Sequence, residues 1–399
     1  MIILCGAGGT HVLICLPQKQ AIIACMRIMT YILIVIVFGG RFMTKLNYIF
    51  VHGLSGWGSY DKQNERLPYW GMRTGDLLAK LNTEGYACYS ASVSPHGSAY
   101  DRACELYAQL SGTRTDYGSA HSETYGHDRY GRDFTGIPLI ESFDDDSRLV
   151  LIGHSFGGAT VRLFADILKN GRPEETGPDR SPFFEGGKGN RIAAVVTLAA
   201  PHNGTTAYDL FEDPSFDLKS VHVWRIEELA GMLLRKKNTP EEPLPETDCA
   251  AYDMHIDNAL ALNQRLSLDP SVYYFSQPCD ITIQRKNGTY RPMVRKTELL
   301  FRRTSRYMGA YKGTTAGGFV CDENWQPNDG LVNTESAMYP IGDAHTHFDP
   351  DHIEPGIWNV FDTLNIDHMA VQGGLMRRHP VHPYFKKLLT MIDNVCGNN

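Results

Sequence analysis

The sequence has few of the features that would mark a nucleic-acid-binding, disordered or zinc-ribbon protein. Its formal net charge is −7 over 399 residues, with 42% hydrophobic and 21% charged residues, so neither a basic nucleic-acid surface nor a disordered chain is indicated. No two of the nine cysteines are spaced as CxxC, which excludes thioredoxin-type and zinc-ribbon motifs. Internal repeats and low-complexity stretches are also absent. These absences leave a folded protein of one large domain or about two or three smaller ones, whose odd cysteine count does not fix its compartment.

The sequence also has no apolar run long enough to span a membrane. Residues 28–38 are nearly all apolar, which suits the hydrophobic region of a secretory signal better than a span of about 20 residues. We therefore expect residues 1–42 to be a leader or signal-like segment of a secreted protein, although no A-x-A cleavage site follows. A leader without any role is the alternative, and translation from Met43 would give a cytoplasmic protein. Residues 43–399 are expected to form a single domain.

From residue 43 onward, apolar runs alternate with amphipathic stretches. This alternation predicts an α/β fold, with a mostly parallel central sheet and helices on both faces. Strands are expected at 46–51, 86–93, 149–152, 192–198 and 272–275, and helices at 74–82, around 161–168 and around 385–392. Residues 203–245, rich in Glu, Pro and Lys, are predicted to be an insertion outside the sheet that acts as a short lid.

Residues 153–157 read GHSFG and fit the pattern G-x-S-x-G. The pattern is informative because an apolar strand is predicted immediately before it and an amphipathic helix immediately after it, as a nucleophile elbow requires. Ser155 is therefore the candidate nucleophile. A structural glycine-rich turn is the alternative.

A serine hydroxyl needs a histidine base and a carboxylate, which follow it in this kind of site in the order Ser, Asp/Glu, His. His368, after an apolar segment near the C-terminus, is the candidate base, and Asp329 in the sequence NDGLV is the candidate acid. Asp367 is interpreted as a surface or helix-capping residue. Three further histidines in a polar stretch are expected in a solvated loop, where H-x-H would bind metal only adventitiously: His345, His347 and His352.

The oxyanion hole of such a site consists of two backbone N–H groups. One belongs to the residue after the nucleophile, here Phe156, and the other to an early loop that follows a strand. Residues 52–58 (HGLSGWG) are that loop, and Leu54 is the candidate donor.

With these residues the chain resembles the secreted α/β-hydrolase lipases of Gram-positive bacteria, both the thermophilic Bacillus type and the staphylococcal type. The resemblance implies the α/β-hydrolase fold and hydrolysis of carboxylic esters through an acyl-enzyme on Ser155, with His368 as base and then acid and Asp329 orienting it. It extends over residues 45–392, and besides HGLSGWG and GHSFGG it includes YWG at 69–71, YDRACE at 100–105, DYG at 116–118, GH at 126–127, FEGG at 184–187, PHNGTT at 201–206 and NDG at 328–330.

The resemblance also implies a zinc ion held by two aspartates and two histidines. The matching residues are Asp101, His121, His127 and Asp248. Four protein ligands leave no open position on a tetrahedral ion, so the zinc is expected to be structural. The Bacillus-type lipases also bind calcium just after the catalytic histidine. Because the matching positions here are Ala370 and about Leu375, which offer no side-chain oxygen, we expect no calcium at that site.

The sequence therefore predicts a lipase or esterase that acts on triacylglycerols or other hydrophobic esters, with polyesters as an extension of the same idea. Its partners would be the ester substrate and a lipid or polymer surface, without nucleic acid, and the protein would be a monomer. One alternative is a zinc-dependent hydrolase in which metal-bound water is the nucleophile. Another is a non-enzymatic binding protein tethered to a membrane through residues 28–38.

Overall fold

The computed structural model describes residues 2–5, 12–15, 45–208 and 246–397. The apolar run at 28–38 and most of the expected lid, residues 209–245, lie outside the described residues. The chain divides into two units, Met1–Thr44 with Gly397–Asn399, and Lys45–Cys396. In the first unit β1 (Ile2–Cys5) pairs antiparallel with β2 (Val12–Cys15).

The second unit is built around a parallel sheet of seven strands, which confirms the predicted α/β class. All five predicted strands are present, and the sheet also contains β14 and β15, which the sequence analysis missed. The strands, in their order across the sheet, are β14 (His345–His347), β15 (Trp358–Val360), β9 (Tyr273–Gln277), β8 (Ile192–Leu198), β7 (Arg148–His154), β3 (Leu46–Val51) and β4 (Ala87–Ala91). Three two-stranded ribbons lie outside it: β5 (Arg114–Asp116) with β6 (Tyr130–Asp133), β10 (Thr282–Gln284) with β11 (Tyr290–Pro292), and β12 (Gly313–Thr314) with β13 (Val320–Cys321).

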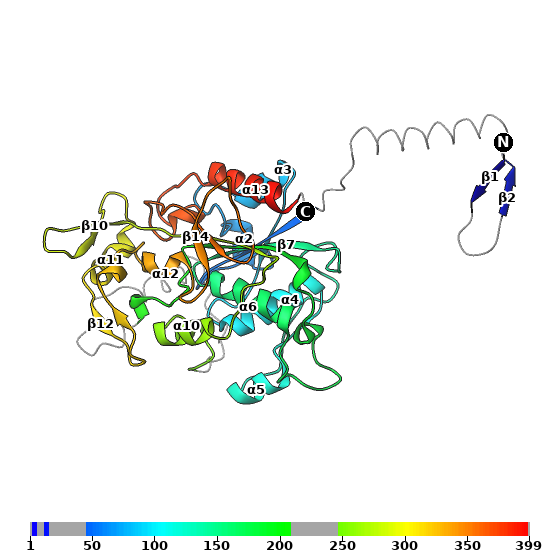
Figure 1. Ribbon diagram of the computed structural model, residues 1–399, viewed down its shortest axis with the longest axis horizontal. Helices are drawn as coiled ribbons and strands as arrows, with labels where there is room; N and C mark the ends of the chain where they lie inside the picture. Colours follow the sequence, from blue (N-terminus) through cyan, green and yellow to red (C-terminus); the bar gives the residue numbers. More distant parts are fainter. Residues whose placement is uncertain (1, 6–11, 16–44, 209–245, 398–399) are drawn as a thin grey trace. The chain divides into compact units, whose positions relative to one another are not determined.

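Helices cover both faces of the sheet (Figure 1). Leu149 and Leu151 of β7 pack in one core with α4 and α6, whereas Val150 and Ile152 pack in the other core with α3 and α13. The helices are α2 (Lys62–Arg66), α3 (Leu77–Thr83), α4 (Ala99–Ser111), α5 (Ser119–Tyr125), α6 (Gly157–Asn170), α9 (Ala250–Asp253), α10 (Ile256–Asn263), α11 (Arg302–Met308), α12 (Thr334–Met338) and α13 (His382–Cys396). Short 3-10 turns are η1 (Pro182–Glu185), η2 (Gly189–Arg191), η4 (Leu299–Phe301), η5 (Glu323–Trp325) and η6 (Ala370–Gln372).

The helix that follows the candidate nucleophile, α6, has the predicted apolar face. Val161, Phe164 and Leu168 are fully buried, and burying each such side chain is worth roughly 1.5–3 kcal/mol. The helix ends at Asn170, and the next residue, Gly171, has a φ of +70°, which glycine adopts without strain. This packing fixes α6 against the sheet, and with it the turn between β7 and α6.

Among the described residues, no helix is both long and apolar enough to cross a membrane. Among the described cysteines, the free thiols include Cys88, Cys104, Cys249, Cys279 and Cys396, most of them buried.

Candidate active site and metal cluster

Ser155 lies in a sharp turn between the last residue of β7 and the first residue of α6. Its φ is +55°, a conformation that non-glycine residues adopt at a cost in strain. The neighbouring glycines make the turn possible: a Cβ on Gly153 would lie 2.4 Å from the Gly157 carbonyl oxygen, and one on Gly157 would lie 2.4 Å from the carbonyl oxygen of Val51. This is the geometry of a nucleophile elbow, which presents the serine hydroxyl at the carboxyl end of the sheet.

Asp329 and His368 are joined directly. Nδ1 of His368 lies 2.7 Å from Oδ2 of Asp329, and both side chains are buried. The other carboxylate oxygen accepts the backbone N–H groups of Leu331 and Val332 at 3.0 and 2.8 Å. The backbone N–H of His368 also donates to the carbonyl of Asp329 at 3.0 Å. The carboxylate is therefore held in one orientation, and the imidazole is held against it.

His368 also lies next to the turn that carries Ser155. The ring of His154, the residue before Ser155, is centred 4.9 Å from the ring of His368. No hydrogen bond joins the Ser155 hydroxyl to His368 in the described part of the chain. Such catalytic hydrogen bonds are often long without substrate and tighten in the reacting complex.

The two predicted oxyanion donors, Leu54 and Phe156, belong to segments next to Ser155. A Cβ on Gly53 would lie 2.7 Å from Cβ of Ser155, so the loop that carries Leu54 packs directly on the turn. Among the described residues, neither the Leu54 nor the Phe156 backbone N–H donates a hydrogen bond. Phe156 also precedes the first residue of α6, where the partial positive charge of the helix N-terminus favours an anion.

The loop that carries Asp329 is tied to the PHNGTT segment at residues 201–206. Thr205 donates its hydroxyl hydrogen to the carbonyl of Leu331 at 2.6 Å, and the Thr206 N–H donates to Oδ1 of Asn333 at 2.9 Å. Residues 203–207, the first of the expected insertion, are buried in this network. In the sequence, PHNGTT is only a mark of resemblance, because its hydrogen bonds to the loop that carries Asp329 join segments far apart in the chain.

The segment after His368 is held by two buried carboxylates. Glu298 is fully buried and accepts the backbone N–H groups of Leu375, Met376 and Arg377 at 2.8–3.1 Å. Burial raises the pKa of Asp367 to about 6, and its carboxylate accepts the N–H groups of Glu298 and Ala370. Asp367 is fully buried, so the surface interpretation is wrong. Its carboxylate accepts the N–H of Ala370, the first residue of η6, but the N-cap position of that turn belongs to Met369, so Asp367 is not a cap residue.

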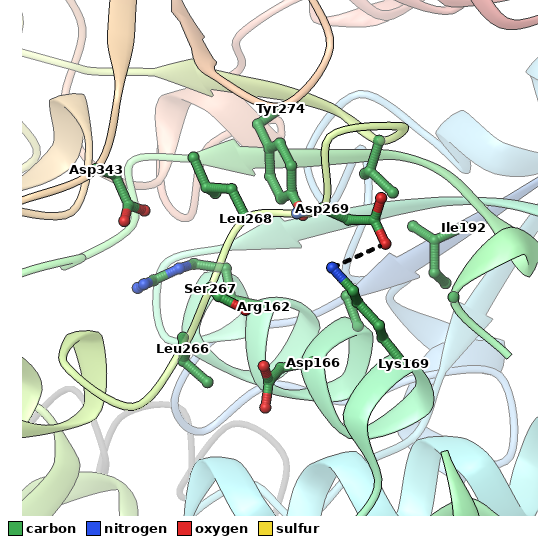
Figure 2. Close-up of a pocket in the computed structure, with 13 residues that line it drawn as sticks. Arg162, Asp166, Lys169, Ile192, Leu266, Ser267, Leu268, Asp269, Tyr274 and Asp343 are labelled. Carbon is green, nitrogen blue, oxygen red and sulfur yellow. Dashed lines mark hydrogen bonds and ion pairs between the residues drawn. The ribbon is translucent and has the colours of Figure 1, made fainter. Parts of the chain in front are cut away.

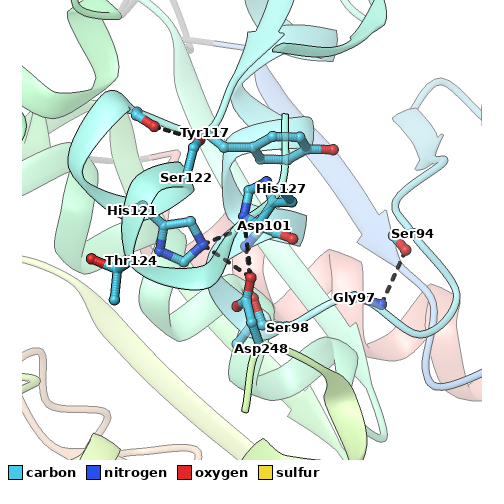
Figure 3. Close-up of polar contacts among 12 residues, drawn as sticks. Ser94, Gly97, Ser98, Asp101, Tyr117, His121, Ser122, Thr124, His127 and Asp248 are labelled. Carbon is cyan, nitrogen blue, oxygen red and sulfur yellow. Dashed lines mark hydrogen bonds and ion pairs between the residues drawn. The ribbon is translucent and has the colours of Figure 1, made fainter. Parts of the chain in front are cut away.

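The four residues matched to a zinc site come together as a cluster (Figure 3). Nε2 of His121 lies 3.1 Å from Oδ1 of Asp101 and 3.2 Å from Oδ2 of Asp248. Nε2 of His127 lies 3.3 Å from the same Asp248 oxygen and 4.0 Å from the Asp101 oxygen. Asp101 is on α4, His121 on α5, His127 just after α5, and Asp248 just before α9, so the cluster connects segments far apart in sequence.

The chemistry of this cluster fits a tetrahedral cation. Ligand bonds of about 2.0–2.2 Å place neighbouring ligand atoms roughly 3.3–3.6 Å apart, close to the distances between these atoms. Nδ1 of His127 lies 2.8 Å from the Asp128 carbonyl and carries the hydrogen, while the buried Nε2 has no hydrogen-bond partner in the described part of the chain. Burial alone would lower the pKa of His121, but hydrogen bonds to Asp101 and Asp248 and their charges raise it to about 9. A cation bound among the four side chains would neutralise the negative charges of the Asp101 and Asp248 carboxylates.

The other histidine-rich segment does not form such a cluster. Within the described ranges, the Asp101 group is the only set of three or more ligand-type side chains close enough to share an ion. His345 and His347 are exposed on the edge strand β14, and His352 is exposed beyond it. The solvated position predicted for these three histidines is therefore confirmed, although two of them belong to a strand.

A small cavity lies at the far end of α6 (Figure 2). Its volume is about 20 Å³, enough for one water molecule. Lys169 borders it and pairs with Asp269 at 3.2 Å. Ser155, Asp329 and His368 do not line this cavity, so it is separate from the candidate active site.

The fold and the position of Ser155 define a class of protein. It is an α/β protein with a serine in the turn between a strand and a helix, at the carboxyl end of a parallel sheet. Residues 44–232 match the family model described as "Lipase-like, C-terminal domain". Lipase 1 of Staphylococcus aureus is 31% identical over 362 residues, which cover 84% of this chain and 52% of that protein. The chain thus spans about half the length of this relative.

Two solved structures match most of the fold. EstA from Clostridium botulinum has a TM-score of 0.78 at 30% identity, with 88% of each chain covered. The Staphylococcus hyicus lipase has a TM-score of 0.72 at 28% identity, covering 88% of this chain and 97% of that one. The chain belongs to the family of bacterial lipases and esterases that includes the staphylococcal lipases.

Proposed function

We propose that the protein is a carboxylic-ester hydrolase in which Ser155 is the nucleophile, His368 the base and Asp329 the residue that orients it. The observation that carries the proposal is the 2.7 Å contact between buried His368 and Asp329, beside a serine held at positive φ. The names of its relatives, lipase and esterase, support ester hydrolysis.

The mechanism follows from the placement of these groups. Nε2 of His368 accepts the hydroxyl proton of Ser155 as Oγ attacks the ester carbonyl. The oxygen that becomes negative is stabilised by the Leu54 and Phe156 N–H groups. Collapse of the tetrahedral intermediate releases the alcohol, which takes the proton from His368, and leaves an acyl group on Ser155. A water molecule, deprotonated by His368, then releases the acid and restores the serine.

We infer a hydrophobic ester as substrate, either a triacylglycerol or another ester presented at a lipid or polymer surface. The lipase names among the relatives support a lipid ester as substrate. Secretion through residues 1–42 and a monomeric state are proposed with it. The lid assigned to residues 203–245 stays a prediction, since most of it lies outside the described residues.

We also propose that Asp101, His121, His127 and Asp248 hold a structural zinc ion. Bound there, zinc would supply neutralisation of two buried carboxylates and a link between α4, α5 and the segment before α9. Four protein ligands leave no open coordination position, which argues against metal-bound water as the nucleophile. The expectation that no calcium binds after His368 stays a prediction, and Glu298 supplies the anchoring of that segment from within the chain.

Removing the metal is expected to lower stability. Purified protein should contain about one zinc ion per chain, and His127→Ala should abolish zinc binding. The variant should also melt several degrees lower, because an ion present at 100 times its Kd adds about 2.7 kcal/mol to the free energy of unfolding. Metal content by mass spectrometry and thermal unfolding measure this. As the control, His347→Ala removes an exposed histidine and should change neither. Full zinc content in His127→Ala would contradict the assignment.

A fluorophosphonate ester tests the serine mechanism directly. One equivalent is expected to abolish hydrolysis of p-nitrophenyl butyrate and to add its mass to the peptide that contains Ser155, because only an activated serine displaces the fluoride. The Ser155→Ala variant should take up no label. If the protein hydrolyses the ester, resists the reagent and loses activity at once with a chelator, the chemistry belongs to the metal and the serine mechanism is wrong.

A further inference from the structure

Tyr69 lies between the oxyanion loop and the nucleophile turn, and its hydroxyl contacts both. It is 3% exposed, and its ring packs edge-on against Trp57 and Trp70. The hydroxyl oxygen accepts the backbone N–H of Gly53 at 3.1 Å and lies 2.6 Å from Nδ1 of His154. Neither partner belongs to the segment that carries Tyr69.

His154 continues this connection to the base. It is fully buried, and its Nε2 lies 3.0 Å from the backbone carbonyl oxygen of His368. A carbonyl oxygen can only accept, so the hydrogen is on Nε2. Burial and the neighbouring charge of His368 lower the pKa of His154 well below its usual value, so the ring is neutral and Nδ1 accepts. The Tyr69 hydroxyl must then donate to Nδ1.

The donor and the acceptor are therefore fixed for each of the three hydrogen bonds that connect Gly53 to His368. Gly53 donates to Tyr69, Tyr69 donates to His154, and His154 donates to His368. One end fixes the residue before Leu54, the proposed oxyanion donor. The other end holds the backbone carbonyl of His368, and the backbone N–H of the same residue donates to the carbonyl of Asp329.

We propose that Tyr69 and His154 are positioning residues that hold the oxyanion loop and the base in register with each other. The proposal rests on the proposed function, since it assigns roles relative to Leu54, Ser155 and His368. Among the described residues, neither side chain forms a hydrogen bond with the Ser155 hydroxyl or with the ring nitrogens of His368, although the rings of His154 and His368 are centred 4.9 Å apart. A small displacement of either loop would affect the transition state more than substrate binding, because misplacement by about 1 Å can cost on the order of 100-fold in rate.

The test compares Tyr69→Phe with a matched variant. Tyr69→Phe should lower kcat for p-nitrophenyl butyrate by about 10- to 100-fold with KM nearly unchanged, and should slow fluorophosphonate labelling of Ser155 by the same factor. Tyr48→Phe is the control: Tyr48 is equally buried, and its hydroxyl contacts Leu389 and Asp393 of α13 at 3.1 and 2.6 Å. It should lose comparable stability and keep full activity.

Two variants of His154 complete the test. His154→Gln retains a donor and an acceptor and should keep more of kcat than His154→Leu, which retains neither. The double variant Tyr69→Phe/His154→Leu should be no slower than the worse single variant, since both interrupt one chain of hydrogen bonds. Wild-type kcat in Tyr69→Phe, or an equal loss in Tyr48→Phe, would overturn the proposal.

The Ser155→Ala variant distinguishes a failure of the serine mechanism from a failure of the positioning roles of Tyr69 and His154. If it keeps full activity, the serine mechanism fails and the positioning roles fail with it. If it is inactive while Tyr69→Phe and His154→Leu match the wild type, only the positioning roles are wrong. If His154→Leu does not fold, the comparison of Tyr69→Phe with His154→Gln at equal fractions folded still decides the question.

Discussion

Replacement of Ser155 by alanine is expected to lower kcat for p-nitrophenyl butyrate by about 10⁶-fold. The variant loses the atom that forms the acyl-enzyme, and the turn between β7 and α6 contains no second residue with a hydroxyl group. The Ser155 hydroxyl makes no hydrogen bond among the described residues, so its loss should leave the melting temperature within about a degree of the wild type. Steady-state hydrolysis and thermal unfolding of the same preparation measure both effects.

Ser90→Ala is the matched control for this result. Ser90 is a buried serine of β4 whose hydroxyl has no hydrogen-bond partner in the described part of the chain. Its replacement should leave kcat unchanged, which separates the loss of the nucleophile from the loss of a buried hydroxyl. Activity above one per cent in a folded Ser155→Ala protein would instead point to the metal-centred alternative, and the zinc content of the variant would then have to account for it.

Much of the sheet could be predicted from the sequence because its central strands are buried on both faces. Runs such as the one at β8, which is buried throughout, carry enough apolar β-branched residues to be recognised locally. The short edge strand β14 has no such signal: residues 345–347 read HTH and are largely exposed, and they become a strand only by pairing at the sheet edge. Strand order depends on contacts between distant segments, which a local pattern does not contain.

The candidate site likewise has features that a local sequence pattern predicts and features that depend on contacts between distant segments. The elbow around Ser155 is local, so a pentapeptide with its flanking strand and helix was enough to predict it. Glu298 and Tyr69 had no comparable signal, because each acts on backbone groups from distant parts of the chain. A glutamate in a polar stretch is expected at the surface, and only tertiary packing shows that Glu298 is fully buried against residues 375–377.

The choice of Asp329 over Asp367 as the acid can be decided by a pair of matched substitutions. Asp329→Asn is expected to lower kcat by about 10⁴-fold, because an amide can donate to Nδ1 and so favours the wrong tautomer of His368. Asp367→Asn changes an equally buried carboxylate one residue from the base, but this carboxylate bonds to the N–H groups of Glu298 and Ala370, not to the imidazole.

Asp367→Asn should therefore cost stability and less than about tenfold in kcat, since it disturbs only the segment that follows the base. The pH dependence of kcat/KM for both variants and the wild type completes the measurement. If Asp329→Asn retains activity while Asp367→Asn loses it, the acid has been misassigned. The hydrogen bond between Asp329 and His368 would then be structural, and the serine mechanism would need a different carboxylate.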